Sequence, residues 1–262
     1  VRFRRAMSLA INREEMNETL WLGLGKPAAA LPLKVSFVTP ADRNYMIKYD
    51  PAAANKLLDE MGLKRGPDGT RLRPDGKPLQ LLWEYSTQFS SNGAVQLVRG
   101  YWKAVGVDVN MKEITTQLSR QKALEGGADI LVEWDVPFEP NLISDVQTYM
   151  PPYRAASPLF GAAWREWNDS KGAKGEEPPP WAKRVYALEP EWRTLVPGSP
   201  RYVEIGKEMV KINLENMTII GTVTDLPGPT VVSKKLANVR EWTVQHYNYA
   251  RTYPFRADQW YF

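Results

Sequence analysis

Apolar residues recur at helical spacing at the start of the chain. Phe3, Met7 and Ala10 lie three or four positions apart, with arginines between them, which predicts an amphipathic helix. Asn12 follows, and Glu15 stands three residues later, a spacing typical of the N-cap of a second helix. The chain is therefore expected to open with two helices in tandem.

A third helix is predicted where a carboxylate precedes a proline. Asp50 is a favourable N-cap, Pro51 suits the first helical position, and Gly62 ends the apolar stripe. Two Pro-Asp-Gly sequences follow, at 67–69 and 74–76. The stretch between them is too short for a long element, so we expect tight turns or a hairpin there.

Strand and helix patterns alternate in the next part of the chain. Runs of branched and aromatic residues are separated by stretches whose apolar residues share one helical face. This order predicts an α/β lobe in which at least part of the sheet is parallel. The first strand is apolar on both faces at its centre, as in a covered sheet. The predicted strands cover residues 79–85, 107–111 and 128–134, and the predicted helices cover residues 92–105 and 116–124.

The remainder of the chain changes in character. A long connection rich in proline and aromatic residues leads to a short helix, a polar loop and two longer helices. The β-branched runs near the end have no helix to cover them, so we expect them to pack on another part of the protein. These segments are the connection 135–157, the short helix 159–167, the loop 172–180, the helices 181–195 and 200–216, and the runs 218–223 and 229–233.

Composition limits the chemistry that the chain can perform. Hydrophobic residues make up 43% and charged residues 24%, as in a folded globular protein. There is no cysteine and one histidine, His246, so disulfides, thiol catalysis and ordinary zinc sites are excluded. Phosphate-binding loop motifs are absent as well. We therefore expect no cofactor, no metal and no enzymatic activity, and interpret His246 as a structural or surface residue.

The charge pattern is mildly basic. The formal net charge is +4, and the densest cluster of positive residues is Arg2, Arg4 and Arg5. A nucleic-acid binder would show a stripe of lysine and arginine on one element, so we expect no nucleic-acid partner. No apolar run is long enough for a transmembrane helix. The first residue is valine rather than methionine, so we expect a chain processed or cut from a longer one.

Candidate binding residues lie at the ends of two predicted strands. Trp134 and Asp135 end an apolar strand and open a long loop. Carboxyl ends of strands face the ligand crevice in an α/β sheet. The tryptophan offers a flat apolar surface and the aspartate two acceptor oxygens, for a ligand with an apolar face and ammonium or hydroxyl donors. Tyr85 and Ser86 end another strand and are expected at the same crevice. A core tryptophan with a turn-forming aspartate is the alternative interpretation.

Trp164 is a further candidate binding residue. It lies three positions before Trp167, so the two rings share one helix face. Aromatic pairs of this kind usually belong to a core, and the alternative is that they open into a cleft.

Several segments are similar, in the same order, to segments of one protein family. They are VRFRRAMSLAINREEMNETLWLGLGKPA, YDPAAANKLLDEMGL, DGTRLRPDGKPLQL, YWKAVGVDVNMKEI, GAKGEEPPP and ENMTIIGTVTDLPGPTVVSKKLANV. Together they resemble family 5 of the extracellular solute-binding proteins, the oligopeptide- and dipeptide-type binding proteins of ABC importers. The similarity extends over nearly the whole chain, and its specificity lies in the order of the segments.

The resemblance implies a periplasmic or extracellular receptor, peripheral to the membrane or lipid-anchored to its outer face. Such a receptor closes two lobes around a small solute, a peptide or an oligosaccharide, and delivers it to the transmembrane subunits of an ABC permease. The implied fold is a lobe of the type II periplasmic binding proteins, with a mixed sheet flanked by helices. Residues 1–217 would form the inserted second lobe. Residues 218–262 would cross the hinge into the first lobe, the rest of which is absent from this chain.

The resemblance also bears on the candidate site. In peptide-binding members a tryptophan followed shortly by an aspartate helps to hold the peptide backbone and its ammonium group. Trp134 matches that tryptophan. Asp135 follows it directly, whereas the family places the aspartate a few residues later.

Two other classes of function remain as alternatives. A glycoside-active enzyme would need two carboxyl groups across the cleft, and Asp135 and Glu139 are the candidate pair. A protein-interaction domain that serves as a receptor for a membrane partner is the second alternative.

Overall fold

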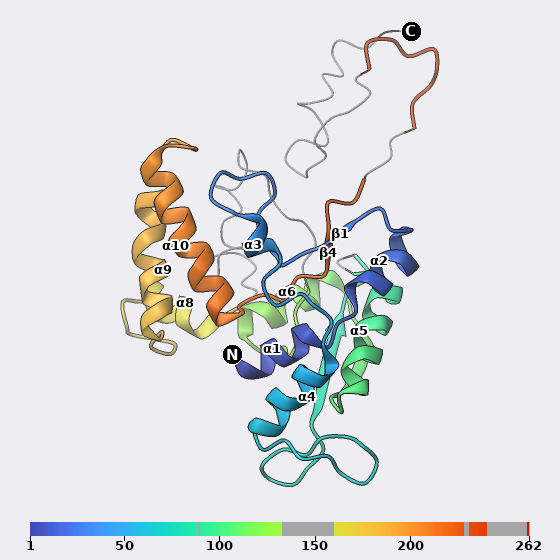
Figure 1. Ribbon diagram of the computed structural model, residues 1–262. Coiled ribbons are helices and arrows are strands. Elements are labelled where there is room, and N and C mark those ends of the chain that lie inside the picture. Colours follow the sequence, from blue (N-terminus) through green and yellow to red (C-terminus); the bar gives the residue numbers. More distant parts are fainter. Residues whose placement is uncertain (89, 133–159, 228–230, 240–260, 262) are drawn as a thin grey trace.

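The computed structural model describes residues 1–88, 90–132, 160–227, 231–239 and 261 (Figure 1). The predicted helices are present within a few residues of their expected bounds, and a short helix, α3, is added where no helix is predicted. The strands are β1 (Lys26–Pro27), β2 (Gln80–Tyr85), β3 (Asp108–Glu113) and β4 (Val223–Thr224). The helices are α1 (Arg2–Leu9), α2 (Arg13–Trp21), α3 (Pro40–Arg43), α4 (Pro51–Glu60), α5 (Asn92–Ala104), α6 (Thr116–Glu125), α8 (Ala162–Asp169), α9 (Pro180–Trp192) and α10 (Pro200–Asn216).

The predicted caps form at the start of α2 and α4. The side chain of Asn12 accepts a hydrogen bond from the backbone N–H of Glu15 at 3.2 Å. The carboxylate of Glu15 in turn accepts one from the Asn12 side-chain amide at 3.1 Å. At α4, Asp50 accepts from the backbone N–H of Ala53 at 2.8 Å, and Pro51 occupies the first helical position. Both helices therefore begin where the capping residues predict.

β2 and β3 confirm the predicted parallel pairing. They run from Gln80 opposite Asp108 to Tyr85 opposite Glu113, with α5 as the connection between them. Because the two strands are parallel, their carboxyl ends meet at one edge of the sheet.

The predicted strand over 128–134 is wrong for residues 128–132, which form no strand. The carboxylate of Asp129 instead accepts a hydrogen bond from the backbone N–H of Leu82 at 2.9 Å. A side chain thus occupies a position on the outer edge of β2 where a neighbouring strand would pair. Leu82 is 42% exposed, so the prediction that the centre of this strand is covered on both faces is also wrong. Residues 133 and 134 lie outside the described residues.

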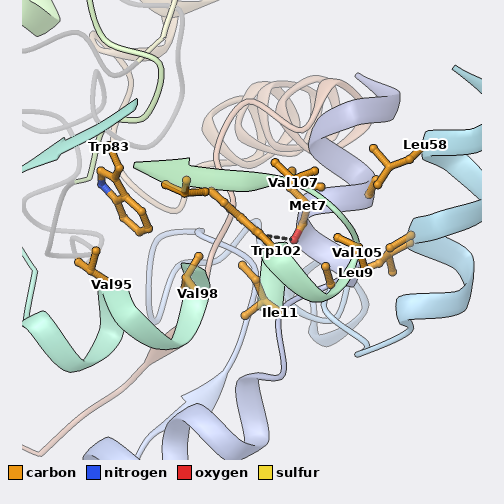
Figure 2. Packing of buried hydrophobic residues seen from close by; sticks show 14 of the residues in the cluster. Met7, Leu9, Ile11, Leu58, Trp83, Val95, Val98, Trp102, Val105 and Val107 are labelled. Atoms are coloured by element: carbon orange, nitrogen blue, oxygen red, sulfur yellow. Dashed lines mark hydrogen bonds between the residues drawn. The ribbon is translucent and has the colours of Figure 1, made fainter. Parts of the chain in front are cut away.

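Apolar side chains of α1, α4, α5, β2 and β3 form one cluster, which we call the sheet core (Figure 2). At its centre the indole rings of Trp83 and Trp102 stack with their centroids 5.9 Å apart. The Trp102 indole N–H donates to the carbonyl oxygen of Met7 at 3.0 Å, which satisfies its one polar group. The sheet core therefore joins β2, α5 and α1 in a single packed unit.

A second cluster, the helical core, joins α9 and α10 to residues 28–38. Figure 1 shows α9 and α10 side by side, apart from the helices around the sheet. The ring of Phe37 lies 6.0 Å from Trp192 and 5.6 Å from Tyr202, measured between centroids. A Cβ added at Gly206 would come within 2.5 Å of the Phe37 ring, so this position needs glycine. Aromatic packing on a glycine thus fixes the segment 28–38 on α10.

β1 and β4 pair antiparallel and bring distant parts of the chain together. The predicted strand over 218–223 is wrong except for its last residue, Val223. The backbone of Gly221 makes other contacts instead. A Cβ added at Gly221 would come within 2.3 Å of the backbone of residues 28–30. Its carbonyl oxygen accepts a hydrogen bond from Arg13 at 2.9 Å, so a side chain takes the place of a ladder partner. Residues 231–233, in the last predicted run, form no strand either.

The two Pro-Asp-Gly sequences form the predicted turns. Gly69 and Gly76 have φ angles of 83° and 78°, in the left-handed region that glycine adopts without strain. An isolated antiparallel bridge flanks each turn.

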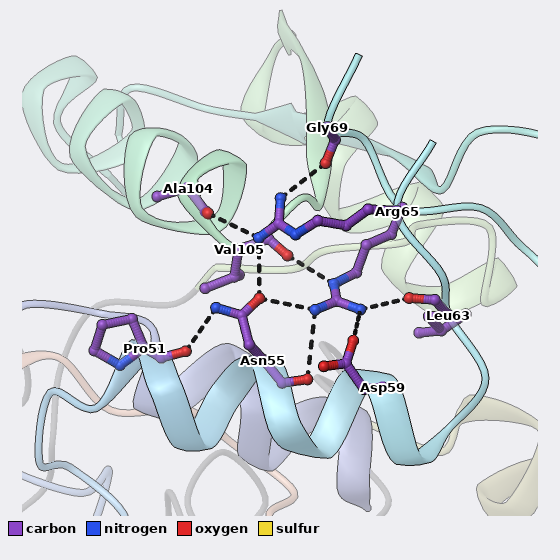
Figure 3. Close-up of polar contacts among 9 residues, drawn as sticks. Pro51, Asn55, Asp59, Leu63, Arg65, Gly69, Ala104 and Val105 are labelled. Atoms are coloured by element: carbon purple, nitrogen blue, oxygen red, sulfur yellow. Dashed lines mark hydrogen bonds and ion pairs between the residues drawn. The ribbon is translucent and has the colours of Figure 1, made fainter. Parts of the chain in front are cut away.

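A buried arginine anchors this turn region to the helices (Figure 3). The side chain of Arg71 is 1% exposed, and its Nε donates to the carbonyl oxygen of Val105 at 2.8 Å. Its two terminal nitrogens donate to Asp59 Oδ1 at 2.7 Å and to Asn55 Oδ1 at 2.8 Å. The carbonyl oxygen of Leu63 accepts a further bond. Arg71 therefore ties α4, the end of α5 and the turn region together.

We predict that Arg71→Met lowers the free energy of unfolding by about 3 kcal/mol, because buried carbonyl groups lose their donor. Urea denaturation measures the change. Arg73→Met is the matched control, since Arg73 and its partner Asp75 are 46% and 49% exposed. The control should stay within about 0.5 kcal/mol of the wild type. Equal effects of the two substitutions would contradict an anchoring role for Arg71.

Candidate functional site

The carboxyl ends of β2 and β3 lie beside the N-termini of α5 and α6. Ser91 caps α5 by accepting from the backbone N–H of Ala94 at 3.2 Å, and Thr115 caps α6 from Leu118 at 3.3 Å. Both helices therefore direct the positive ends of their dipoles towards this edge of the sheet, which favours acceptor groups of a ligand. We call this edge the strand-end site, made of Tyr85, Ser86, Thr87, Gln88, Glu113 and Thr116.

A chain of hydrogen bonds crosses the strand-end site. The hydroxyl groups of Ser86 and Thr116 are 2.8 Å apart, and Thr116 donates to Gln88 Oε1 at 2.8 Å. Because Thr116 has one hydroxyl proton and gives it to Gln88, Ser86 must be the donor in the first bond. The chain thus runs from buried Ser86 through Thr116 to exposed Gln88. It leaves the amide N–H groups of Gln88 without an acceptor among the described residues.

Tyr85 is adjacent to Ser86 in sequence, but its side chain makes different contacts. It is 8% exposed, and its hydroxyl donates to Asn92 Oδ1 at 2.9 Å, in the first turn of α5. Tyr85 therefore stands behind the edge and fixes α5 to β2. On the solvent side, the hydroxyl of Thr87 donates to Glu113 Oε1 at 3.1 Å and links the two strand ends.

Glu84 holds α6 against the face of β2 that is opposite to α5. Its side chain is 5% exposed and lies in ion pairs with Lys122 of α6 and with Lys112, whose nitrogen is 3.5 Å away. The hydrogen bond from Lys122 is the main reason that the pKa of Glu84 is lowered, and Lys112 adds to the effect. This ion pair helps to place Thr116, in the first turn of α6, beside Ser86.

Trp164 lies in an aromatic cluster. Its ring meets the rings of Phe160 and Trp181 edge to face, each with centroids 5.5 Å apart. All three side chains are half-buried. Trp167 lies on the same helix, with Lys183 Nζ 5.2 Å from its ring centroid. None of the described ring contacts of Trp164 reaches Ser86, so a shared site for these two residues stays a prediction.

The two residues that anchor the sequence prediction, Trp134 and Asp135, lie outside the described residues. The same is true of Glu139, the partner of Asp135 in the enzyme hypothesis, and of His246. The predicted crevice is therefore described on the side formed by β2 and β3.

Sequence reasoning missed Thr116 and Gln88. Gln88 stands in a short loop, where a polar residue gives no specific signal. A signal exists for Thr116, because Thr115 and Thr116 directly follow a predicted strand and open a helix. Threonine at such a position is either a cap or a group exposed at the sheet edge, and here Thr115 and Thr116 play these two roles.

A small pocket lies between α1 and the end of α10. It is lined by residues that include Ser8, Tyr45, Asn213, Met217 and Gly221, and its volume is about 10 Å³. This is room for about one water molecule, too little for a solute.

We predict that the ion pairs of Glu84 make the protein more stable at neutral pH than in acid. A carboxyl group whose pKa is lowered by folding contributes stability above its unfolded pKa, about 4.3, and loses it as the pH falls through the folded pKa. Glu84→Gln should therefore have a lower melting temperature than the wild type at pH 7. The difference in melting temperature between the two proteins should become smaller as the pH falls towards 3. Thermal unfolding followed by circular dichroism measures this. The exposed Glu60→Gln is the control, and an equal pH dependence in both variants would refute the assignment.

Comparison with known proteins identifies the family of this chain. The model described as "Bacterial extracellular solute-binding proteins, family 5 Middle" matches residues 1–156. An oligopeptide-binding protein, OppA, of Lactococcus lactis subsp. lactis is 28% identical over 188 residues, which cover 67% of this chain and 31% of that protein.

Two solved structures share the fold. An oligopeptide-binding protein OppA superposes with a TM-score of 0.71 at 31% identity, over 85% of this chain and 37% of that one. The periplasmic binding protein MelB of Agrobacterium fabrum C58, in complex with stachyose, superposes with a TM-score of 0.68 at 16% identity, over 85% of this chain and 33% of that one. The second likeness shows the fold alone. This chain thus spans roughly a third of the length of these three proteins.

The predicted fold class is confirmed. The fold is that of the type II periplasmic binding proteins, although the described strands form two small sheets rather than one mixed sheet. The family model covers more than half of the chain, and its match begins at the first residue. The chain belongs to family 5 of the bacterial extracellular solute-binding proteins.

Proposed function

We propose that this chain is part of the substrate-binding component of an ABC importer. That component captures an extracytoplasmic solute between two lobes and delivers it to the permease. The observation that carries the proposal is the family match over residues 1–156, and the likeness to the oligopeptide-binding proteins supports it. Because this chain spans about a third of those proteins, the activity of the whole protein is inferred from the family.

In this proposal residues 1–217 form the inserted second lobe, and residues 218–262 cross the hinge and return to the first lobe. The antiparallel pairing of β1 with β4 supports this division, because it places an early and a late segment side by side, as two crossings would lie. Figure 1 shows that the described residues 231–239 lie away from the helices of the first 217 residues. The helical core and all buried residues of the sheet core belong to the first of these two parts.

The solute would bind across the strand-end site and the loop that begins at Trp134. We propose that Trp134 packs on an apolar face of the solute and that Asp135 accepts from its ammonium or hydroxyl groups. The chain from Ser86 through Thr116 to Gln88 supports this, because it ends in amide donors at the edge where a solute would lie. Tyr85 would act from behind by fixing α5, and Trp164 would line the cleft from α8.

A peptide is the solute class that we favour over an oligosaccharide. The relatives at 28% and 31% identity are oligopeptide-binding proteins, whereas the stachyose complex is 16% identical. A peptide backbone offers carbonyl acceptors to the Gln88 amide and an ammonium group to a carboxylate, so both ends of the proposed site would find partners.

We propose that the protein acts in the periplasm or outside the cell. It would be peripheral to the membrane or attached to the outer face of the membrane by a lipid anchor. Members of the family are extracytoplasmic, and the partner would be the transmembrane subunits of an ABC permease. Among the described residues, no helix has the length and apolar character needed to cross a bilayer.

We predict that Trp134→Ala weakens solute binding about tenfold or more, because an aromatic contact at the centre of a binding site commonly contributes that much. Native mass spectrometry of the whole gene product, as purified, would first identify the bound solute: peptides differ in mass from oligosaccharides. Calorimetry with the identified solute then compares the variants. Trp134→Phe keeps an aromatic surface and should lose far less affinity. Unchanged affinity in Trp134→Ala would remove this residue from the site.

We also predict that Thr116→Val weakens binding about five- to thirtyfold, because the Ser86 hydroxyl loses its acceptor and Gln88 Oε1 loses its donor. Valine has nearly the shape of threonine, so the fold should be kept. Thr194→Val, at the exposed end of α9, is the matched control. If Thr116→Val binds the solute with wild-type affinity, as the control should, the hydrogen-bond chain plays no part in recognition.

A further inference from the structure

Arginines of α1 bind the carbonyl end of α10. Arg4 Nε donates to the carbonyl oxygen of Met217 at 2.8 Å, and its Nη2 donates to that of Asn216 at 2.9 Å. Arg5 Nη2 donates to the carbonyl oxygen of Glu215 at 2.7 Å. These carbonyl groups end a helix and have no partners within it, and they carry the negative end of its dipole. The two arginines therefore cap a helix more than 200 positions away in sequence.

Arg13 extends the same pattern beyond the helix end. Its side chain is buried, at 2% exposure, and its Nε donates to the carbonyl oxygen of Gly221 at 2.9 Å. Its Nη1 donates to the carbonyl oxygens of Ser8 and Ile47, each at 2.9 Å. One guanidinium group thus joins three separate segments of the chain. We call Arg4, Arg5 and Arg13 together the arginine seam.

The seam lies where the two cores meet. The sheet core and the helical core are separate apolar clusters, and the contacts of the seam run from α1 to the end of α10 and from α2 to Gly221. The water-sized pocket lies in the same place, between Ser8 on one side and Asn213 and Met217 on the other. Polar bonds and a packing gap thus replace continuous apolar packing at this boundary.

Arg4 also contacts the aromatic cluster around α8. Its guanidinium carbon is 4.9 Å from the ring centroid of Phe160, and that ring lies 6.3 Å from the ring of Trp181 in α9. Arg4 therefore contacts the helical side of the boundary both through the end of α10 and through Phe160.

We propose that the arginine seam is a joint between two separately cooperative units, and that the helical core can unfold as a unit while the sheet core stays folded. Apolar packing makes each core cooperative, whereas the described contacts of the seam between them are mainly hydrogen bonds to carbonyl oxygens. Regions joined by few apolar contacts open at lower free energy than a continuous core. The strand-end site lies wholly on the sheet side, on β2, β3 and the helices beside them, so opening at the seam would leave it intact.

Hydrogen exchange by mass spectrometry, on the whole gene product without solute, tests the joint. Arg4→Met should speed exchange about tenfold or more, together, in α9, α10 and residues 28–38, because bonds to a charged donor are lost. Exchange in α4, α5, β2 and β3 should stay within about threefold of the wild type. Arg2→Met makes the same change at an exposed position of the same helix and should leave both groups unchanged.

Two outcomes would overturn the proposal. Acceleration by one common factor in both cores would show that they form a single unit. Acceleration confined to the last turn of α10 would show that Arg4 only caps that helix.

A second measurement needs no substitution. In wild-type protein at urea concentrations below the unfolding midpoint, α9 and α10 should share an opening with a lower free energy and a smaller urea dependence than β2 and β3. One common urea dependence for all four elements would refute the joint, whether or not the protein binds a solute.

Discussion

Buried arginines bonded to main-chain carbonyl oxygens are the interaction on which this structure depends. Arg71 and Arg13 are 1% and 2% exposed, and most of their acceptors are backbone carbonyl groups. A guanidinium group carries five donors, and burying its charge is tolerated only when acceptors surround it. Helix ends and irregular segments supply such acceptors, because their carbonyl groups have no regular partners. Burial lowers the pKa of Arg13 to about 10, so it stays charged at neutral pH.

The position of the strand-end site follows from one of these arginines. The backbone N–H of Arg71 donates to the carbonyl oxygen of Gly106, two residues before β3, at 2.7 Å. A Cβ at Gly106 would come within 2.9 Å of the carbonyl oxygen of Gly69, and its φ of 87° also requires glycine. The turn region therefore determines where α5 ends and β3 begins. The register of β3 on β2 then brings Thr116 beside Ser86.

Local features of the fold could be predicted from the sequence, because their causes lie within a few residues. Asn12 and Asp50 cap helices, and the Pro-Asp-Gly sequences turn, through hydrogen bonds and backbone angles that neighbouring residues determine. Strands need a partner, and here the periodic pattern misled. At 128–132 the Asp129 carboxylate takes the backbone N–H that a strand would pair with. At 218–222 the chain packs on another backbone and bonds to Arg13.

The contacts of the positive cluster at the start of the chain could not be predicted, for the same reason. Charge patterning suggests partners that are acidic or external, whereas the partners of Arg4 are carbonyl oxygens 212 and 213 positions away. Every residue has a carbonyl group, so no sequence pattern marks which ones an arginine will bind. Thr116 and Gln88 escaped prediction similarly, since their significance lies in a contact between two strand ends.

The hydrogen-bonded strand-end site lies apart from the arginine seam that joins the two cores. Ser86, Thr116 and Gln88 are bonded to one another in the absence of any ligand, and Glu84 and Tyr85 fix the helices on which this edge depends. A solute that used these groups would order few new side chains, so little conformational entropy would be lost on binding. The seam between the cores lacks that continuous apolar support. Opening at the boundary would therefore unfold α9 and α10 as a unit and spare Ser86, Thr116 and Gln88.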